Sequence, residues 1–368
     1  MNNELEFLYQ TLKKAKNPEE VFGILAGTIE DKLSACTKTF RHLVALAHPD
    51  HFLNEEDKKV ATEAFKLLQP FYEAAKQKIQ NGTYGDLSMG VSTEPVHITT
   101  KRNAYELGSI LFTGSISDIF KGQHEEAGIG KEILIKVARS YKNNDFISNE
   151  STVLKKLGKE SHHGLEELIP KCIDSFIISD TATRTIRRAN VFDYKPDLVN
   201  LAYVIKKYPG GIDPKDMAWM FKRILVAIWV AHEQGIVHGA VLPQHILLNL
   251  VNHGILLIDW SFSAKISETY IKAIDSTCKD FYPLSVFDKE VATPEVDIYM
   301  AAVTIIKLLG GDSKTKIIPN SVPKEIRSIL RACILEHSGF TAMEIHEEFN
   351  QTIKKLFGPP KFRNFQIK

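Results

Sequence analysis

The hydrophobic positions divide the chain into a helical segment followed by a mixed one. Over residues 4–80, apolar side chains recur every three or four residues, which is typical of amphipathic helices, and no strand-like alternation occurs. The turn-forming pairs Asn81-Gly82 and Tyr84-Gly85 then interrupt this pattern. We therefore predict a helical domain over residues 1–82 and a linker over residues 83–103.

From about residue 105 the pattern changes to short β-rich runs and later returns to helix. Strands are predicted over residues 133–137, 246–250 and 255–258. Further short strands are predicted within residues 173–205. Helical patterns run from Pro214 to about His232 and again after Pro294. Strands before helices predict an α+β body with a β-rich lobe over residues 104–192 and a helix-rich lobe over residues 193–368.

Composition excludes several classes of protein. The chain has 368 residues, of which 44% are apolar and 25% are charged, which is ordinary for a folded protein of two or three domains. Its net charge is +1, so no overall positive field attracts nucleic acid or an anionic membrane. No apolar run reaches the roughly 20 residues that a membrane-spanning helix needs. The four cysteines lie far apart, so we expect a soluble protein of the reducing cytoplasm without a disulfide framework.

A tripeptide, His48-Pro49-Asp50, lies between two predicted helices. Proline disfavours helical geometry at the residue before it, so we expect the tripeptide in an exposed loop. Its surroundings resemble a J-domain, the module of DnaJ-type co-chaperones. The residues that carry this resemblance are Val21–Leu25, Phe40–Val44, Phe65, Leu68 and Tyr72.

The J-domain resemblance implies a partner. In that family the loop and a basic face of the preceding helix dock on a DnaK-type chaperone. The corresponding residues here are His48, Pro49 and Asp50 in the loop, with Lys38 and Arg41 on the helix. A DnaK-type chaperone and an unidentified protein client are therefore the expected partners.

Six further pieces of sequence follow one another in a recognisable order between residues 111 and 295. They are Leu111–Ile119, Ile133–Lys136, Asn149-Glu150 at the expected start of a helix, His238–His245, Ile258–Ser261 and Ala292–Glu295. Over residues 105–355 the chain therefore resembles a protein kinase, most closely the bacterial proteins in which a J-domain precedes the kinase-like part. The resemblance implies an all-α J-domain followed by a bilobal kinase-like fold, with ATP and Mg²⁺ as cofactors.

The residues that hold the nucleotide in kinases are mostly retained. Of the three glycines in the phosphate loop only Gly114 remains, with Phe112 and Ser117 in the other two places. The resemblance implies a nucleotide site made of Gly114, Ser115, Ser117, Lys136, Glu150, Asp193 and Asp259. In this set Asp193 lies in the hinge beside the base, and Asp259 is the ligand for the metal ion.

The residues that carry out phosphoryl transfer are lost. Ala240 stands where kinases have the aspartate that receives the acceptor proton, and a methyl group cannot accept a proton. Leu242 replaces a lysine that faces the phosphates. His245 replaces an asparagine that holds Mg²⁺, an ion that prefers oxygen ligands. His238 is retained, and the family role of that histidine is structural, through Asp297. We therefore expect no catalytic residue in this loop.

Three functions remain open from the sequence. The favoured one is a co-chaperone scaffold whose pseudokinase part binds ATP as a switch and whose J-domain recruits a DnaK-type chaperone to a partner. The second is an atypical ATP-dependent phosphoryl- or nucleotidyl-transferase that uses Asp118 or Asp259 in an unfamiliar role. The third is an interaction module without nucleotide, its pocket filled by Phe112 or Trp260. The missing catalytic acid favours a protein that is not an enzyme.

Overall fold

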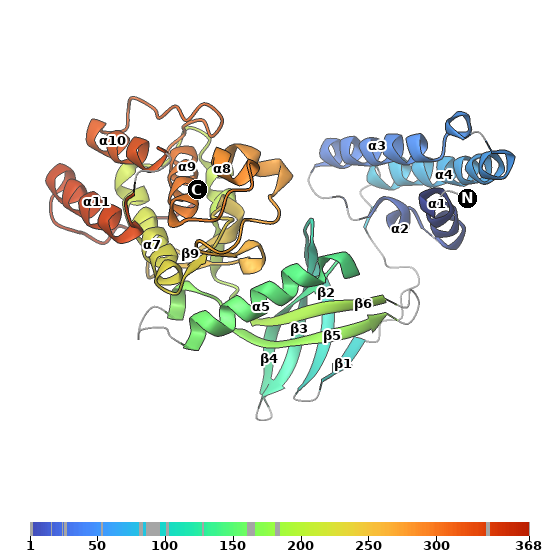
Figure 1. The fold of residues 1–368 in the computed structure, drawn as a ribbon, viewed down its shortest axis with the longest axis horizontal. Coiled ribbons are helices and arrows are strands. Elements are labelled where there is room, and N and C mark those ends of the chain that lie inside the picture. Colours follow the sequence, from blue (N-terminus) through green and yellow to red (C-terminus); the bar gives the residue numbers. More distant parts are fainter. Residues whose placement is uncertain are drawn as a thin grey trace. The chain divides into compact units, whose positions relative to one another are not determined.

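The computed structural model forms two compact units, Met1–Glu94 and Pro95–Lys368, each with its own hydrophobic core (Figure 1). The structure describes residues 3–15, 17–23, 25, 28–52, 54–80, 84–85, 96–100, 103–126, 129–159, 166–180, 185–335 and 339–367. The division between the units falls inside the segment that the sequence predicts as a linker.

The first unit is helical, as its apolar periodicity predicts. It contains α1 (Asn3–Lys14), α2 (Pro18–Phe22), α3 (Ile29–Leu46), a 3₁₀ turn (Pro49–His51) and α4 (Glu55–Gln80). Thr28 and Asp31 form a capping box that fixes the start of α3. The Phe40 ring stacks on Tyr72 with a centroid distance of 3.9 Å, which joins α3 to α4 around the buried Leu68.

The second unit begins with a six-stranded antiparallel sheet in the order β1-β2-β3-β4-β6-β5. The strands are β1 (Val96–Thr99), β2 (Ala104–Thr113), β3 (Ser117–Glu126), β4 (Ile129–Ala138), β5 (Cys172–Asp180) and β6 (Thr185–Asp193). The prediction of a linker up to residue 103 is therefore wrong for β1. Its short run of β-branched residues pairs with β2 and completes the edge of the sheet.

Helix α5 (Asn144–Lys159) packs on this sheet, in contact with β4, β5 and β6 (Figure 1). The helix begins five residues before Asn149-Glu150, so the prediction that this pair opens the helix is wrong. Asn144 ties the first turn to the sheet, because its side chain donates to the carbonyl of Ile186 and accepts from the N–H of Arg188. As a result, Glu150 lies in the second turn of a helix that is already formed.

The rest of the second unit is mainly helical around one large apolar core. Its helices are α6 (Leu201–Lys207), α7 (Pro214–Glu233), α8 (Leu284–Phe287), α9 (Pro294–Leu308), α10 (Lys324–Cys333) and α11 (Ala342–Phe357). Its short strands are β7 (Leu198–Asn200), β8 (Ile236–Val237), β9 (Ile246–Asn249), β10 (Gly254–Leu257) and β11 (Ala264–Lys265). The predicted strand region 173–205 extends too far, because α6 already begins at Leu201.

A buried carboxylate holds the loop after β8 in place. Asp297 on α9 accepts the backbone N–H groups of His238 (2.7 Å) and Gly239 (2.8 Å). Gly239 has φ +75°, and a Cβ there would lie 2.8 Å from the carbonyl oxygen of Phe262, so the close approach requires glycine. These contacts position residues 238–245 beside the end of β10.

Two expectations from the composition can be compared with the structure. None of the helices that the structure describes is long and apolar enough to cross a membrane. All four cysteines are free, and Cys36 and Cys333 are buried.

We predict that the helical unit unfolds independently when its core is weakened. Leu68→Ala removes a fully buried side chain and should lower the free energy of unfolding of this unit by about 2–5 kcal/mol. The three tryptophans all lie in the second unit, so their fluorescence should keep its urea midpoint while helical circular dichroism is lost earlier. Lys59→Ala on the same helix should change neither signal, and a shifted fluorescence midpoint in Leu68→Ala would disprove the independence.

Candidate functional site

The centre of the candidate site is the side-chain ammonium of Lys136. This residue lies near the end of β4 and donates hydrogen bonds to Glu150 Oε1 (2.9 Å), Asp259 Oδ1 (2.6 Å) and Ser261 Oγ (2.9 Å). Lys136 and Glu150 are buried, with 5% and 2% of their surface exposed. One ammonium thus joins the sheet, α5 and the segment after β10.

The cluster joins two carboxylates to one ammonium. Burial opposes the charge on Lys136, but Asp259 and Glu150 outweigh it and raise the pKa of Lys136 to about 12. Burial alone would raise the pKa of Asp259, but the Lys136 ammonium outweighs this effect and holds that pKa well below its usual range. Burial raises the pKa of Glu150, which makes Asp259 the carboxylate best able to attract a further cation.

A second contact of Asp259 is with the ring of His245. Asp259 adopts a left-handed backbone conformation (φ +64°), which aspartate tolerates better than most residues. Its Oδ2 lies 3.3 Å from His245 Nε2, and His245 Nδ1 lies 2.9 Å from the carbonyl oxygen of Ala240. Asp259 therefore touches both the Lys136 ammonium and the imidazole.

The loop that contains the lost catalytic positions is well packed. Ala240 and Leu242 are fully buried in the apolar core. Neither residue therefore supplies a polar group to the cluster. His238 Nε2 donates to the carbonyl of Ile258 (3.0 Å), its Nδ1 accepts from the N–H of Ala240, and its ring packs on Trp260. His238 is therefore structural, as the sequence suggests.

The hairpin between β2 and β3 corresponds to the phosphate loop. The Gly114 N–H donates to the carbonyl of Ser117 (2.9 Å) and closes a tight turn whose tip carries the exposed Ser115. Arg139 holds this turn, since its N–H donates to the Ile116 carbonyl (3.0 Å) and its guanidinium donates to the Gly114 carbonyl (3.1 Å). The turn is thus fixed from outside by a residue that the sequence patterns did not single out.

The register of the sheet decides which hairpin residues face the cluster. Ile119 on β3 lies directly opposite Lys136, and Ser117 two residues earlier shares its face. Asp118 lies opposite Val137, whose side chain is in the core on the other face. The role considered for Asp118 as a reacting group is therefore wrong, because that carboxylate faces Arg139 (3.6 Å) and not Lys136.

Two other sequence assignments are revised by the structure. The Asp193 carboxylate forms an ion pair with Lys131 (2.7 Å) and shares a face with Ile133, so only the backbone of Asp193 remains available to a nucleotide base. Phe112 is 59% exposed, and Trp260 is buried and donates to the carbonyl of Leu257. The idea that either aromatic ring fills the nucleotide pocket is therefore wrong.

Two asparagines complete the cluster, and the sequence patterns gave neither of them a role in the site. Asn190 on β6 lies opposite Lys136 and donates to Glu150 Oε2 (3.0 Å) and to the carbonyl of Ile147 (2.8 Å). Asn149 donates to the carbonyls of Ser261 (3.2 Å) and Ser263 (2.9 Å). The sequence held a signal for Asn190, which is a polar residue between apolar ones in a predicted strand region. It held no comparable signal for a role of Asn149 in the site.

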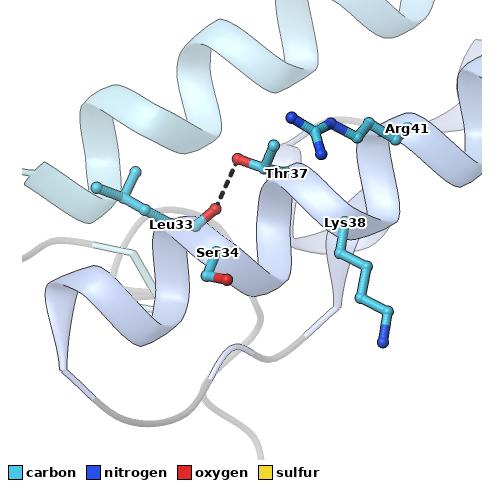
Figure 2. Close-up of a pocket in the computed structure, with 5 residues that line it drawn as sticks. All are labelled: Leu33, Ser34, Thr37, Lys38 and Arg41. Carbon is cyan, nitrogen blue, oxygen red and sulfur yellow. Dashed lines mark hydrogen bonds between the residues drawn. The ribbon is translucent and has the colours of Figure 1, made fainter.

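The helical unit contains the other predicted site. The side chains of His48 and Asp50 are 43% and 87% exposed, and the Asp50 N–H donates to His48 Nδ1. Figure 2 shows Lys38 and Arg41 on one stretch of α3, beside a shallow hollow of about 530 Å³. Leu33, Ser34 and Thr37 line the rest of the hollow. The loop and the basic side chains thus lie on the surface, where a partner can reach them.

Comparisons with known proteins bear on the second unit. The family model for the protein kinase domain matches residues 105–359, which include the Lys136 cluster and the loop over residues 238–245. The serine/threonine-protein kinase PrkC of Bacillus subtilis (strain 168) is 22% identical over 209 residues, which make up 56% of this chain and 30% of that relative. The chain therefore spans less than a third of the length of PrkC.

We predict that acid destabilises the second unit through His238. Burial lowers the pKa of His238 to about 4, below the roughly 6.5 of an unfolded histidine. The unfolded state then binds the proton more readily, so the free energy of unfolding should fall by about 2 kcal/mol between pH 7.5 and pH 5. Urea unfolding followed by tryptophan fluorescence measures this change, and His238→Gln should show a smaller pH dependence. An identical slope in both proteins would contradict the assignment.

Proposed function

The chain belongs to the protein kinase family, and from that premise we propose that its second unit binds ATP with a divalent cation but transfers phosphate poorly or not at all. The observation that carries this proposal is the three-way contact of Lys136 with Glu150, Asp259 and Ser261. Kinases use the corresponding lysine and aspartate to hold the nucleotide phosphates and their metal ion. The residues for binding are therefore in place.

Two of the residues at the site suit ATP with a divalent cation, and a third does not suit Mg²⁺. The Lys136 ammonium suits phosphate oxygens, and the Asp259 carboxylate, which its low pKa keeps charged, suits a cation. A bound cation would neutralise charge on the phosphates. His245 does not fit Mg²⁺, because imidazole is a poor ligand for that ion.

Loss of the acceptor chemistry argues against turnover. Ala240 offers no proton acceptor, and the absence of one general base alone costs about 10²–10⁴ in rate. Leu242 stands where kinases have a lysine that faces the phosphates, and its side chain is buried in the apolar core. We infer that ATP serves as a ligand that favours one conformation of this unit, which is how a bound ligand acts as a switch.

An atypical transferase is the alternative closest to this proposal. The similarity to a serine/threonine-protein kinase supports it. Against it, the Asp118 carboxylate faces away from Lys136, and Asp259 is already bound to the Lys136 ammonium. A nucleotide-free interaction module is favoured less, because neither Phe112 nor Trp260 occupies the site.

We predict that ATP with a divalent cation raises the melting temperature of the second unit. A ligand at 100 times its Kd adds about 2.7 kcal/mol to the free energy of unfolding, which tryptophan fluorescence detects as a higher melting temperature. Lys136→Met should abolish the shift. This change also leaves Glu150 and Asp259 without the Lys136 ammonium, so Asp259→Asn provides a second test. Asp259→Asn should weaken the dependence of the shift on the divalent cation.

The control for this experiment is Lys265→Ala, which removes an exposed lysine paired only locally with Glu268. It should keep the full shift. An equal shift in wild type and both site variants, or no shift in wild type, would refute the nucleotide site. Rapid transfer of labelled phosphate to an acceptor would refute the loss of turnover.

For the helical unit we propose a J-domain that recruits a DnaK-type chaperone to a protein client in the cytoplasm. The supporting observation is the partly exposed His48 beside the highly exposed Asp50, just after a helix with exposed Lys38 and Arg41. Basic side chains at the surface favour a partner with an acidic face. The client would then be a protein bound by this chain and delivered to the chaperone.

We predict that His48→Gln abolishes stimulation of the ATPase of a DnaK-type chaperone by the full-length protein. The matched control is His51→Gln in the same loop, whose ring donates inward to the carbonyl of Ala45 and should be dispensable for docking. Steady-state ATP hydrolysis by the chaperone measures the effect, with circular dichroism to verify that both variants fold. Equal stimulation by His48→Gln and wild type would refute the proposal.

A further inference from the structure

The contact between His245 and Asp259 has the geometry of two ligands of one metal ion. The carbonyl of Ala240 can only accept a hydrogen bond, so the Nδ1 atom of His245 that faces it at 2.9 Å carries the proton. In the neutral ring the lone pair is then on Nε2, which faces Asp259 Oδ2. Histidines that bind metals are commonly oriented by such a bond from the other ring nitrogen to a carbonyl.

The distance between His245 Nε2 and Asp259 Oδ2 also favours two metal ligands over a hydrogen bond. A charge-assisted hydrogen bond from imidazolium to carboxylate would be about 2.7–2.9 Å long, whereas Nε2 and Oδ2 are 3.3 Å apart. Two ligand atoms at about 2.1 Å from one metal ion would be separated by 3.3 Å at an angle of about 100°. That angle lies between octahedral and tetrahedral geometry.

The charge and the solvent exposure of His245 and Asp259 also suit a bound cation. The other oxygen of Asp259 stays bound to Lys136, so a cation at Oδ2 need not break the cluster. The side chains of His245 and Asp259 are 12% and 19% exposed, which leaves them reachable from solvent. Within the described part of the chain no three His, Cys, Asp or Glu side chains gather around a metal position. Nucleotide phosphates and water would have to complete the coordination.

We propose that His245 and Asp259 together bind a divalent transition-metal ion, such as Mn²⁺ or Co²⁺, in preference to Mg²⁺. The proposal rests on the nucleotide site proposed above and specifies its metal. Imidazole bound to a metal favours transition ions over Mg²⁺, which keeps oxygen ligands and gives up water reluctantly. The replacement of an amide by an imidazole at position 245 therefore changes the class of ion that the site selects.

The decisive measurement is pulsed electron paramagnetic resonance on the full chain with Mn²⁺ and a non-hydrolysable ATP analogue. Coordination by His245 should give a ¹⁴N coupling of an imidazole to Mn²⁺, a signal that a merely structural histidine does not produce. His245→Asn, which supplies an amide oxygen in place of the ring, should bind the nucleotide and lose the coupling. It should also lower the affinity for Co²⁺ relative to Mg²⁺ by about ten-fold or more.

The outcomes separate this inference from the proposed nucleotide site. Nucleotide binding with no ¹⁴N coupling, and with the same preference for Co²⁺ over Mg²⁺ in wild type and His245→Asn, would overturn the metal assignment and leave the nucleotide site standing. Failure of the analogue to bind with any ion would refute the nucleotide site. Mn²⁺ alone, titrated into the protein without nucleotide, then tests the pair directly, and absence of the coupling there would overturn the assignment as well.

Discussion

The second unit depends on one shared ammonium. Lys136 donates to both Glu150 and Asp259, and these carboxylates come from a helix and from a segment more than 100 residues later in the chain. Removing one partner of a buried ion pair typically costs about 3–5 kcal/mol, because a charge is left without compensation. The position of α5, the turn after β10 and the candidate ligand site are therefore coupled through Lys136.

Much of this arrangement is predictable from the sequence because the chemistry is carried by residue types at fixed spacings. Lys136, Glu150 and Asp259 were all identified from the resemblance to the protein kinase signature set, and the ion pair of Lys136 with Glu150 that it implies is present. The helices were predictable from apolar periodicity. Strand β1 was not, since a strand of four residues at a sheet edge has no periodicity of its own to recognise, and its pairing partner decides its conformation.

The parts that escaped prediction are those that depend on three-dimensional register. Whether Asp118 faces the site is decided by the residue opposite it on β4, and whether Asp193 does is decided by its pairing with Ile133. Arg139 and Asn190 act by reaching groups that are distant in sequence. A linear pattern identifies which residues are available to a site, but the sheet decides on which face each one lies.

The buried Leu242 has a consequence for any attempt to engineer catalysis into this unit. A kinase lysine at this position would now place an ammonium among apolar side chains, at a cost of several kcal/mol. An acid introduced at position 240 would therefore bring little benefit while Leu242 remains, and a lysine introduced at position 242 first would damage the fold. Each single substitution is unfavourable without the others. Engineering phosphoryl transfer into this unit would therefore require several coordinated substitutions, including changes to the core around position 242.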